Sequence, residues 1–364
     1  MKAPVAPTFG EPGRLTIEEL QLATRNHGMP LEALRYPITP TGLHYLLTHY
    51  DVPAVDPEPW TLEISGAVVE PVRLSLADLR ARSLSRVTVT MECAGNGRAF
   101  LDPRPLSQPW LHEAVGTAEW AGVPLSELLD AAGMAAGALE VVFRGLDRGL
   151  ENGVEQTYER SLTVGEARRP EVLIAIDMNG NPLLPQHGAP ARLVVPGWYG
   201  MANVKWLSAI SVVREPFTGY QQSWSYRLRQ DPSETGAPLS RIAAHALMLP
   251  PGIPDFFTRD RVVALGPHRL TGRVWSGDQP IDGVDVSFDD GDTWVEATLD
   301  PADLGPWAWR SWAFDWIPSR AGRYVLACRA RVDQSAETPG RPAWNLGGYA
   351  NPAPQRIVVT VTDG

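Results

Sequence analysis

Apolar residues fall in short runs separated by turn residues, a pattern typical of proteins built from short strands and helices. Runs with the character of strands cover residues 62–64, 87–91, 139–143 and 172–176. Helix signals start at Thr16 and Ser75, and a longer helical pattern covers residues 123–132 with Ser126 near its start. The alternation of the two patterns predicts an α+β fold.

Beyond residue 260 the pattern changes to strands alone. Runs of strand length cover residues 270–275, 284–288, 312–316, 324–329 and 356–361, with Gly-Asp, Asp-Asp-Gly and Pro-Gly turns between them. Regular short strands of this kind predict an immunoglobulin-like β-sandwich. Residues 230–252 are rich in Pro, Ser, Gly and Ala, which indicates a linker. We therefore expect a mixed domain over residues 1–240 and a sandwich over residues 241–364.

Composition narrows the class of protein. The chain has 364 residues and a net charge of −10, and this acidic balance argues against general binding to nucleic acid. No apolar run reaches the roughly 18 to 20 residues of a membrane-spanning helix, so we expect no membrane insertion. Two distant cysteines form no disulfide framework and fit a reducing compartment. Residues 1–10 lack an apolar signal core and a twin-arginine pair, which predicts a cytoplasmic protein, or a periplasmic one if an export signal was removed.

Cys93 is the first candidate for chemistry. It follows a β-branched run and begins the turn Cys-Ala-Gly-Asn-Gly-Arg, where small residues let a ligand approach the backbone closely. A thiolate in this position can bind a metal or attack a substrate. The other cysteine, Cys328, lies in a distant strand-like run, so a Cys-x-x-Cys zinc site is excluded. The alternative for Cys93 is a buried, inert cysteine.

Four clusters together resemble the sulfite oxidase family of molybdenum enzymes. They are residues 93–98, residues 187–197 with their continuation through Lys205 to Trp206, the Gly-Leu-Asp of residues 145–147, and the Trp-Asn-Leu-Gly-Gly of residues 344–348. The resemblance extends from about residue 39 to residue 361. It implies that the first domain binds molybdenum and molybdopterin, with Cys93 as the metal ligand, and that the sandwich forms the contact of a homodimer.

The resemblance also assigns residues to the pterin. His187, Arg192 and Lys205 would hold its phosphate, and cationic groups among glycines suit that role. Asp147 would accept hydrogen bonds from the ring nitrogens of the pterin. His49 occupies the position of a histidine that contacts the pterin in the family. Taken singly, His187 would be read as a loop histidine and Lys205 as a surface lysine.

On the substrate side the resemblance assigns Arg98, Trp110 and Tyr226, with Tyr220 or Trp224 as alternatives for the tyrosine. Several arginines of the family pattern are missing, because Leu47, Gly97, Ala202 and Gly347 stand at their positions. An oxyanion is normally held by several guanidinium groups, so we expect weak sulfite binding. Arg25, in an Arg-Asn-His triplet whose spacing is wrong for the family, could fold back into the pocket to replace the lost charge.

The function implied by the resemblance is an oxidoreductase that converts a sulfur compound, sulfite to sulfate first of all, by oxygen-atom transfer. Electrons would leave to an external acceptor such as a cytochrome, because the resemblance includes no heme domain. One alternative is a sulfane-type or other dehydrogenase with the same cofactor and a less anionic substrate. A second alternative is a non-catalytic binding protein.

Overall fold

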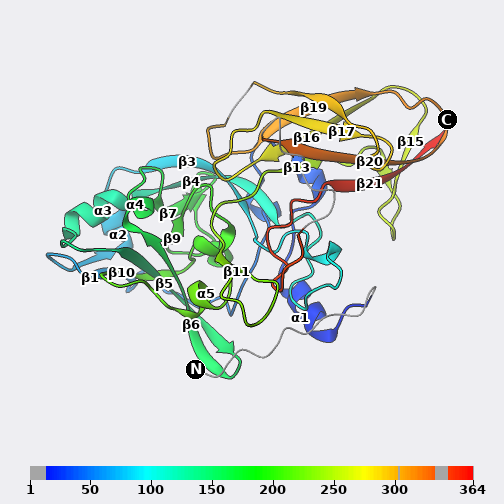
Figure 1. The fold of residues 1–364 in the computed structure, drawn as a ribbon. Helices are drawn as coiled ribbons and strands as arrows, with labels where there is room; N and C mark the ends of the chain where they lie inside the picture. The colour runs from blue at the N-terminus through cyan, green and yellow to red at the C-terminus, as the bar shows by residue number, and fades with distance from the viewer. Residues whose placement is uncertain (1–13, 302–303, 333–342, 364) are drawn as a thin grey trace.

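The computed structural model describes residues 14–301, 304–332 and 343–363. A mixed lobe of strands and short helices lies beside a β-sandwich that contains the C-terminus (Figure 1). The expected class is confirmed: helices and sheets are mixed, and most elements are strands. Residues 1–10, on which the expectation about export rests, lie outside the described residues. No helix among the described residues has the length and apolar character to cross a membrane.

Two sheets form the mixed lobe. The first has the order β2-β1-β10-β5-β6, in which β1 and β10 are parallel and the other neighbours antiparallel. Its strands are β1 (Thr61–Gly66), β2 (Val72–Ser75), β5 (Glu140–Glu151), β6 (Val154–Thr163) and β10 (Leu207–Val213). The second has the order β3-β4-β7-β8, and β9 also pairs with β7. Its strands are β3 (Ser85–Glu92), β4 (Val115–Pro124), β7 (Leu173–Met178), β8 (Asn181–Pro182) and β9 (Arg192–Val194).

The helices are short, and α1, α2 and α4 begin at Ser or Thr side chains that cap them. Their bounds are α1 (Ile17–Arg25), α2 (Leu76–Arg80), α3 (Leu125–Ala132), α4 (Val164–Ala167) and α5 (Tyr220–Ser223). Thr16 and Ser75 each form a capping box, in which the cap hydroxyl accepts from the third helical N–H and the third side chain accepts from the cap N–H. The helix expected from residue 123 begins only at Leu125, because Val123 and Pro124 still pair with β7.

The strands of the sandwich form one continuous hydrogen-bonded series in the order β13-β16-β19-β18-β17-β20-β21-β15-β14. The bounds are β13 (His245–Met248), β14 (Ile253–Pro254), β15 (Arg261–Ala264), β16 (His268–Trp275), β17 (Gly283–Ser287), β18 (Val295–Leu299), β19 (Arg310–Trp316), β20 (Gly322–Arg331) and β21 (Gln355–Thr362). A small hairpin, β11 (Arg227–Leu228) with β12 (Ala237–Pro238), precedes it. The first part of β18 pairs with β17 and its end pairs with β19, so this strand passes from one layer to the other.

The expected linker over residues 230–252 is partly wrong. Its second half contains β13, in which all four residues are buried and which pairs with β16. A four-residue strand between prolines and glycines is too short to show a period of two, so composition hid it.

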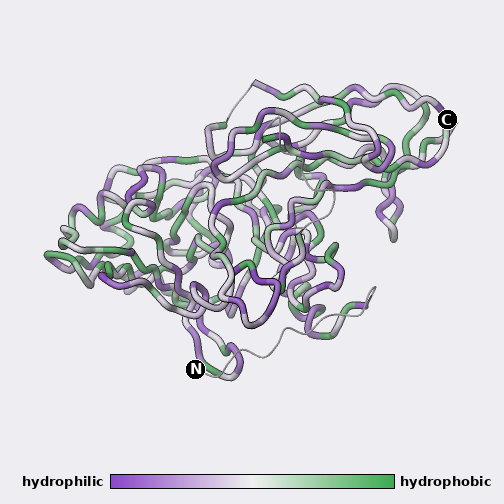
Figure 2. Tube along the Cα trace, viewed as in Figure 1, coloured by the Kyte–Doolittle hydropathy of each residue, from purple (hydrophilic) through white to green (hydrophobic). Residues whose placement is uncertain are grey.

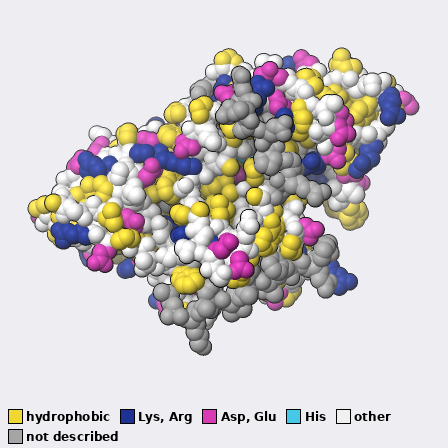
Figure 3. All heavy atoms as spheres, in the orientation of Figure 1, with side chains coloured by type: hydrophobic (Ala, Val, Ile, Leu, Met, Phe, Trp, Pro, Cys, Tyr) yellow, Lys and Arg dark blue, Asp and Glu magenta, His cyan; other side chains and the backbone are white. Residues whose placement is uncertain are grey.

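Each lobe has its own hydrophobic core. One large cluster fills the mixed lobe and reaches Trp275 and Trp309 at the sandwich, and a separate cluster lies between the sandwich layers. Apolar and polar residues alternate along many strands, as a half-buried strand requires (Figure 2). On the face in Figure 3, Lys and Arg side chains are interspersed with Asp and Glu.

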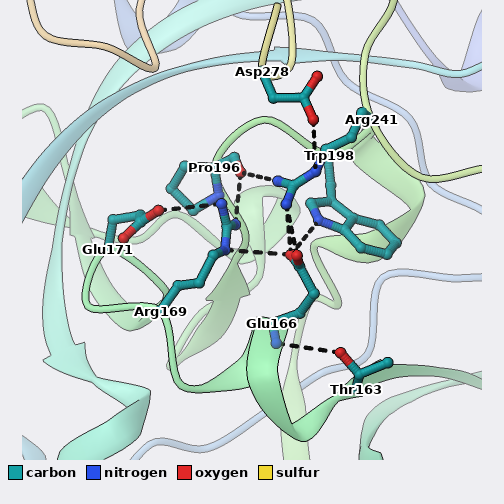
Figure 4. A network of polar contacts seen from close by, with 8 residues as sticks. All are labelled: Thr163, Glu166, Arg169, Glu171, Pro196, Trp198, Arg241 and Asp278. Carbon is teal, nitrogen blue, oxygen red and sulfur yellow. Dashed lines mark hydrogen bonds and ion pairs between the residues drawn. The ribbon is translucent and has the colours of Figure 1, made fainter.

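A network of charged groups joins the two lobes (Figure 4). Glu166 on α4 accepts from Arg241 at 2.7 and 2.8 Å and from the indole N–H of Trp198 at 3.0 Å. Arg169 approaches the same carboxylate at 3.3 Å, and Arg241 lies 3.6 Å from Asp278 in the loop after β16. These partly buried ion pairs tie the mixed lobe to the sandwich.

Candidate active site

A pocket opens in the mixed lobe where β3, β5, β9 and the loops after β9 converge. It encloses about 710 Å³ of space free of protein atoms, part of it open to solvent. Seven of the nine site residues expected from the sequence line it: His49, Cys93, Asp147, His187, Arg192, Lys205 and Tyr226. The other two, Arg98 and Trp110, are buried beside it and do not line its wall.

Cys93 follows the last residue of β3 and faces the pocket. Its backbone N–H donates to the carbonyl of Ala114 at 2.9 Å, and its carbonyl accepts from Asn96 at 2.9 Å, which closes the turn. Burial raises the pKa of the thiol, while the charge of Arg98 and the indole of Trp110 act in the opposite direction. The free thiol therefore stays protonated at neutral pH, and a bound metal would release its proton.

Arg192 lies at the start of β9. Its guanidinium donates to the carbonyls of His187 and Asn203, each at 3.0 Å, and lies 4.8 Å from the ring centroid of Trp120. Burial lowers its pKa to about 10, so the group stays charged at neutral pH. Its Nε has no hydrogen-bond partner among the described residues. A buried guanidinium with an unpartnered N–H donor is suited to bind a phosphate.

Lys205 and Asp147 face the same space from neighbouring segments. The Lys205 ammonium donates to the carbonyls of Leu47 at 2.8 Å and Gln186 at 3.2 Å, and burial lowers its pKa to about 7. Burial raises the pKa of Asp147 to about 6, although the charge of Lys205 opposes this shift. Within the described part of the chain, Oδ1 of Asp147 is buried without a partner. It is available to accept from a ligand.

Two buried histidines stand edge-on in the pocket wall. The ring centroids of His44 and His187 are 5.8 Å apart at 89°, and burial lowers their pKa values to about 4 and about 3, so both are neutral. His44 Nδ1 lies 3.0 Å from the carbonyl of Tyr45, whereas its Nε2 is buried with no partner among the described residues. His44 was not expected from the sequence, because it lies in an apolar segment and belongs to no motif of its own.

His49 lies at the mouth of the pocket. Its Nε2 is 3.0 Å from Oε1 of Glu151 at the end of β5, and its ring is 5.4 Å from that of Tyr158. Arg25 does not enter the pocket: its guanidinium donates to the carbonyls of Thr48 and His49, each at 3.1 Å. Arg25 therefore holds the backbone of the segment that carries His49.

Tyr226 lines the pocket, whereas Tyr220 and Trp224 do not. Its ring lies 5.4 Å from that of Tyr349, and burial raises its pKa well above the usual value. The backbone of Tyr226 has a φ of +27°, a strained conformation for a tyrosine that persists only where surrounding contacts impose it.

Arg98 points toward the C-terminal segment. Its Nε donates to the carbonyl of Gly347 at 2.9 Å and its Nη1 to that of Gln108 at 3.0 Å. Trp110 packs with Cys93 in a small core, and its indole acts on the pKa of the thiol. Gly97, before Arg98, has a φ of +80°, so the turn favours glycine there.

The donor set fits molybdenum with molybdopterin. Cys93 offers one sulfur ligand to a metal, and among the described residues no group of three or more His, Cys, Asp and Glu side chains could hold a metal ion. A soft thiol suits such a metal. The unpartnered atoms of His44, Asp147 and Arg192 suit a ligand with ring donors and a phosphate.

Comparison with known proteins places the chain in a class. The family of oxidoreductase molybdopterin-binding domains matches residues 49–221, and the molybdenum-cofactor oxidoreductase dimerisation domain matches residues 258–362. The fold and pocket therefore define a molybdenum-cofactor oxidoreductase.

The particular family follows from whole-chain relatives. The chain is 35% identical over 335 residues to sulfite oxidase of Gallus gallus, covering 87% of this chain and 72% of that protein. It is 33% identical over 341 residues to mitochondrial sulfite oxidase of Mus musculus, covering 89% of this chain but only 62% of the relative. The chain belongs to the sulfite oxidase family.

A solved structure shows the same fold. The sulfane dehydrogenase SoxCD from Paracoccus pantotrophus superposes with a TM-score of 0.77 at 23% identity, covering 98% of this chain and 90% of that chain.

Proposed function

We propose that the protein oxidises sulfite to sulfate. Water supplies the added oxygen, and two protons and two electrons are released. The observation that carries this proposal is the placement of the Cys93 thiol in a pocket that also presents Arg192, Lys205 and the unpartnered oxygen of Asp147. Molybdenum carried by molybdopterin supplies two-electron redox and oxygen-transfer chemistry when bound.

The pocket residues then divide by role. Cys93 would bind the metal through its thiolate. The buried Arg192 and the partly buried Lys205 form no ion pair among the described groups and would bind the phosphate of the pterin. Asp147 would accept from ring N–H groups, and a donor at Oδ1 would keep it ionised despite burial. The neutral His44 could accept through Nε2.

At the substrate end, Tyr226 offers a phenolic donor on the pocket wall, and a tyrosine with a raised pKa donates without losing its proton at neutral pH. Arg98 would contribute positive charge from behind the wall, since its guanidinium contacts carbonyls outside the pocket.

Electrons would pass to an external acceptor such as a cytochrome. The region matching the dimerisation domain supports a homodimer formed through the sandwich. Measuring the mass of the purified protein by light scattering tests this, and a monomer at micromolar concentration would contradict it.

Metal analysis and kinetics test the function. Protein made in a host that synthesises molybdopterin should contain about one molybdenum per chain and should reduce ferricyanide with sulfite. Thiosulfate and a protein-bound persulfide are the comparison substrates. Turnover of these with none of sulfite would favour the sulfane-type alternative, and absence of molybdenum would remove the proposal altogether.

A further inference from the structure

Arg160 on β6 is a buried cation to which no role at the site has been assigned. The residue is 2% exposed. Its Nη1 donates to the carbonyl of Gln221, and its Nε has no partner among the described residues. No carboxylate in the described part of the chain forms an ion pair with it. A buried guanidinium without a counter-ion is costly, and burial lowers its pKa as expected.

An aromatic neighbour connects Arg160 to the pocket. The guanidinium carbon of Arg160 lies 5.8 Å from the ring centroid of Tyr226, which lines the pocket wall. The Tyr226 ring lies 5.4 Å from that of Tyr349, and the guanidinium of Arg98 lies 5.3 Å from the Tyr349 ring. Two buried guanidinium groups from distant parts of the chain thus flank one pair of phenols.

The charges around this tyrosine pair are unbalanced. Arg98 and Arg160 are both buried, and among the described residues their guanidinium groups donate to carbonyls: those of Gly347 and Gln108 for Arg98, and that of Gln221 for Arg160. Tyr158, whose hydroxyl donates to the carbonyl of Met201 at 2.8 Å, is neutral because burial raises its pKa far above its usual value. In a medium of low dielectric constant, two such cations create a strong positive potential.

We propose that Arg160 is a positioning residue that makes the Tyr226 end of the pocket selective for an oxyanion over a neutral sulfur compound. It does so through Tyr226, since Arg160 contacts its ring and does not itself line the pocket. The cation beside the ring strengthens the phenol as a donor to an anion and holds its orientation. This inference rests on the proposed function of the same site, and it specifies that the substrate is an anion.

Sulfate binding to the molybdenum-loaded, oxidised protein tests the inference. Equilibrium titrations of wild type, Arg160→Gln and Arg160→Lys at several ionic strengths report affinity and its salt dependence. Arg160→Gln removes the charge together with the hydrogen bond to the Gln221 carbonyl, because the glutamine amide is shorter than the guanidinium, whereas Arg160→Lys keeps the charge, so the two variants together separate charge from local bonding. The matched control is Arg144→Gln on the neighbouring strand β5, where the exposed arginine pairs with Glu159.

We expect Arg160→Gln to weaken sulfate binding about tenfold or more and to flatten its dependence on salt, whereas Arg160→Lys stays within about threefold of wild type. The sulfite KM should rise in parallel, with kcat per molybdenum falling less than about threefold. Unchanged sulfate affinity and salt slope in a fully loaded Arg160→Gln protein would overturn the inference.

Two further outcomes keep the test decisive. If Arg160→Gln does not fold, Tyr226→Phe in the molybdenum-loaded protein still decides, because a sulfate affinity that is unchanged without the phenolic donor contradicts an action of Arg160 through Tyr226. Failure of the proposed function looks different: a loaded enzyme would bind sulfate in an Arg160-dependent manner and yet show no turnover of sulfite.

Discussion

Nδ1 of His245, on the first strand of the sandwich, lies 3.0 Å from Oε1 of Glu92, the residue before Cys93. The same carboxylate accepts from Asn96 at 2.9 Å and from the indole of Trp275 at 2.8 Å. All four side chains are buried. The position of the candidate metal ligand therefore depends on contacts from the other lobe.

His245→Phe should lower the free energy of unfolding by about 1–3 kcal/mol, because it removes a donor to a buried carboxylate. We also expect lower molybdenum occupancy, since the turn that starts at Cys93 loses support. Thermal unfolding and metal analysis measure both effects. His27→Phe, at an exposed position of the mixed lobe, is the control and should change stability by less than about 0.5 kcal/mol. Equal effects of the two changes would contradict this role of His245.

Cys93→Ser should abolish turnover and reduce molybdenum content while leaving the fold intact, because a hydroxyl is a much poorer ligand for a soft metal than a thiolate. Cys328→Ser, in a buried strand of the sandwich, should leave activity per chain nearly unchanged. Metal content, sulfite oxidation and circular dichroism of both proteins provide the comparison. Full activity of the Cys93 variant would remove the central assignment.

Asp147→Asn should stabilise the cofactor-free protein and weaken its hold on the cofactor. Burial raises the pKa of Asp147 from 3.8 to about 6, so the wild-type fold loses stability as pH rises from about 4 through 6. Two pKa units correspond to about 3 kcal/mol. The free energy of unfolding of Asp147→Asn should therefore exceed that of wild type by up to this amount at pH 8, and the two proteins should be equally stable below pH 4. Urea unfolding of both proteins at pH 8 and pH 4 measures the difference. A gain at pH 4 as large as that at pH 8 would exclude this cause.

His187→Ala and Arg192→Ala should lower molybdenum occupancy at least about tenfold while turnover per bound molybdenum stays within about threefold, because both residues are assigned to the pterin. Arg168→Ala, which removes an exposed arginine paired with Asp130, is the control. Complete occupancy together with an altered sulfite KM would instead place these residues at the substrate.

Leu47→Arg should lower the sulfite KM about tenfold, because the side chain of Leu47 lines the pocket and the substitution adds a cation there. Leu47→Met is the neutral control of similar volume. Steady-state kinetics measures the sulfite KM of both variants. Equal KM values for Leu47→Arg and Leu47→Met would contradict the expectation. The companion change Gly97→Arg is expected to fail: Gly97 has a φ of +80°, and a Cβ there would lie 2.7 Å from the side-chain nitrogen of Asn351.

Local sequence patterns were sufficient for much of this protein. Signals that depend on neighbouring residues are readable in one dimension, and they predicted the helix starts at Thr16 and Ser75, the turn at Cys93, four strands of the mixed lobe (β1, β3, β5 and β7) and five strands of the sandwich. Family membership followed from motifs of the same local kind and is confirmed by the comparisons. Strands β4, β10 and β13 and the start of α3 were missed, because pairing with distant strands decided them. Strand β6 was missed as well.

Only the tertiary structure decided which charges face the pocket. Arg98 was expected in the pocket but lies behind its wall. Arg25 binds backbone carbonyls of the segment that carries His49 and does not enter the pocket. His44 and Arg160 carry no motif, since burial and the absence of a counter-charge are properties of packing that arise when distant strands meet. Motifs therefore identified the residues suited to the cofactor, whereas the charge available to a substrate was set by long-range folding.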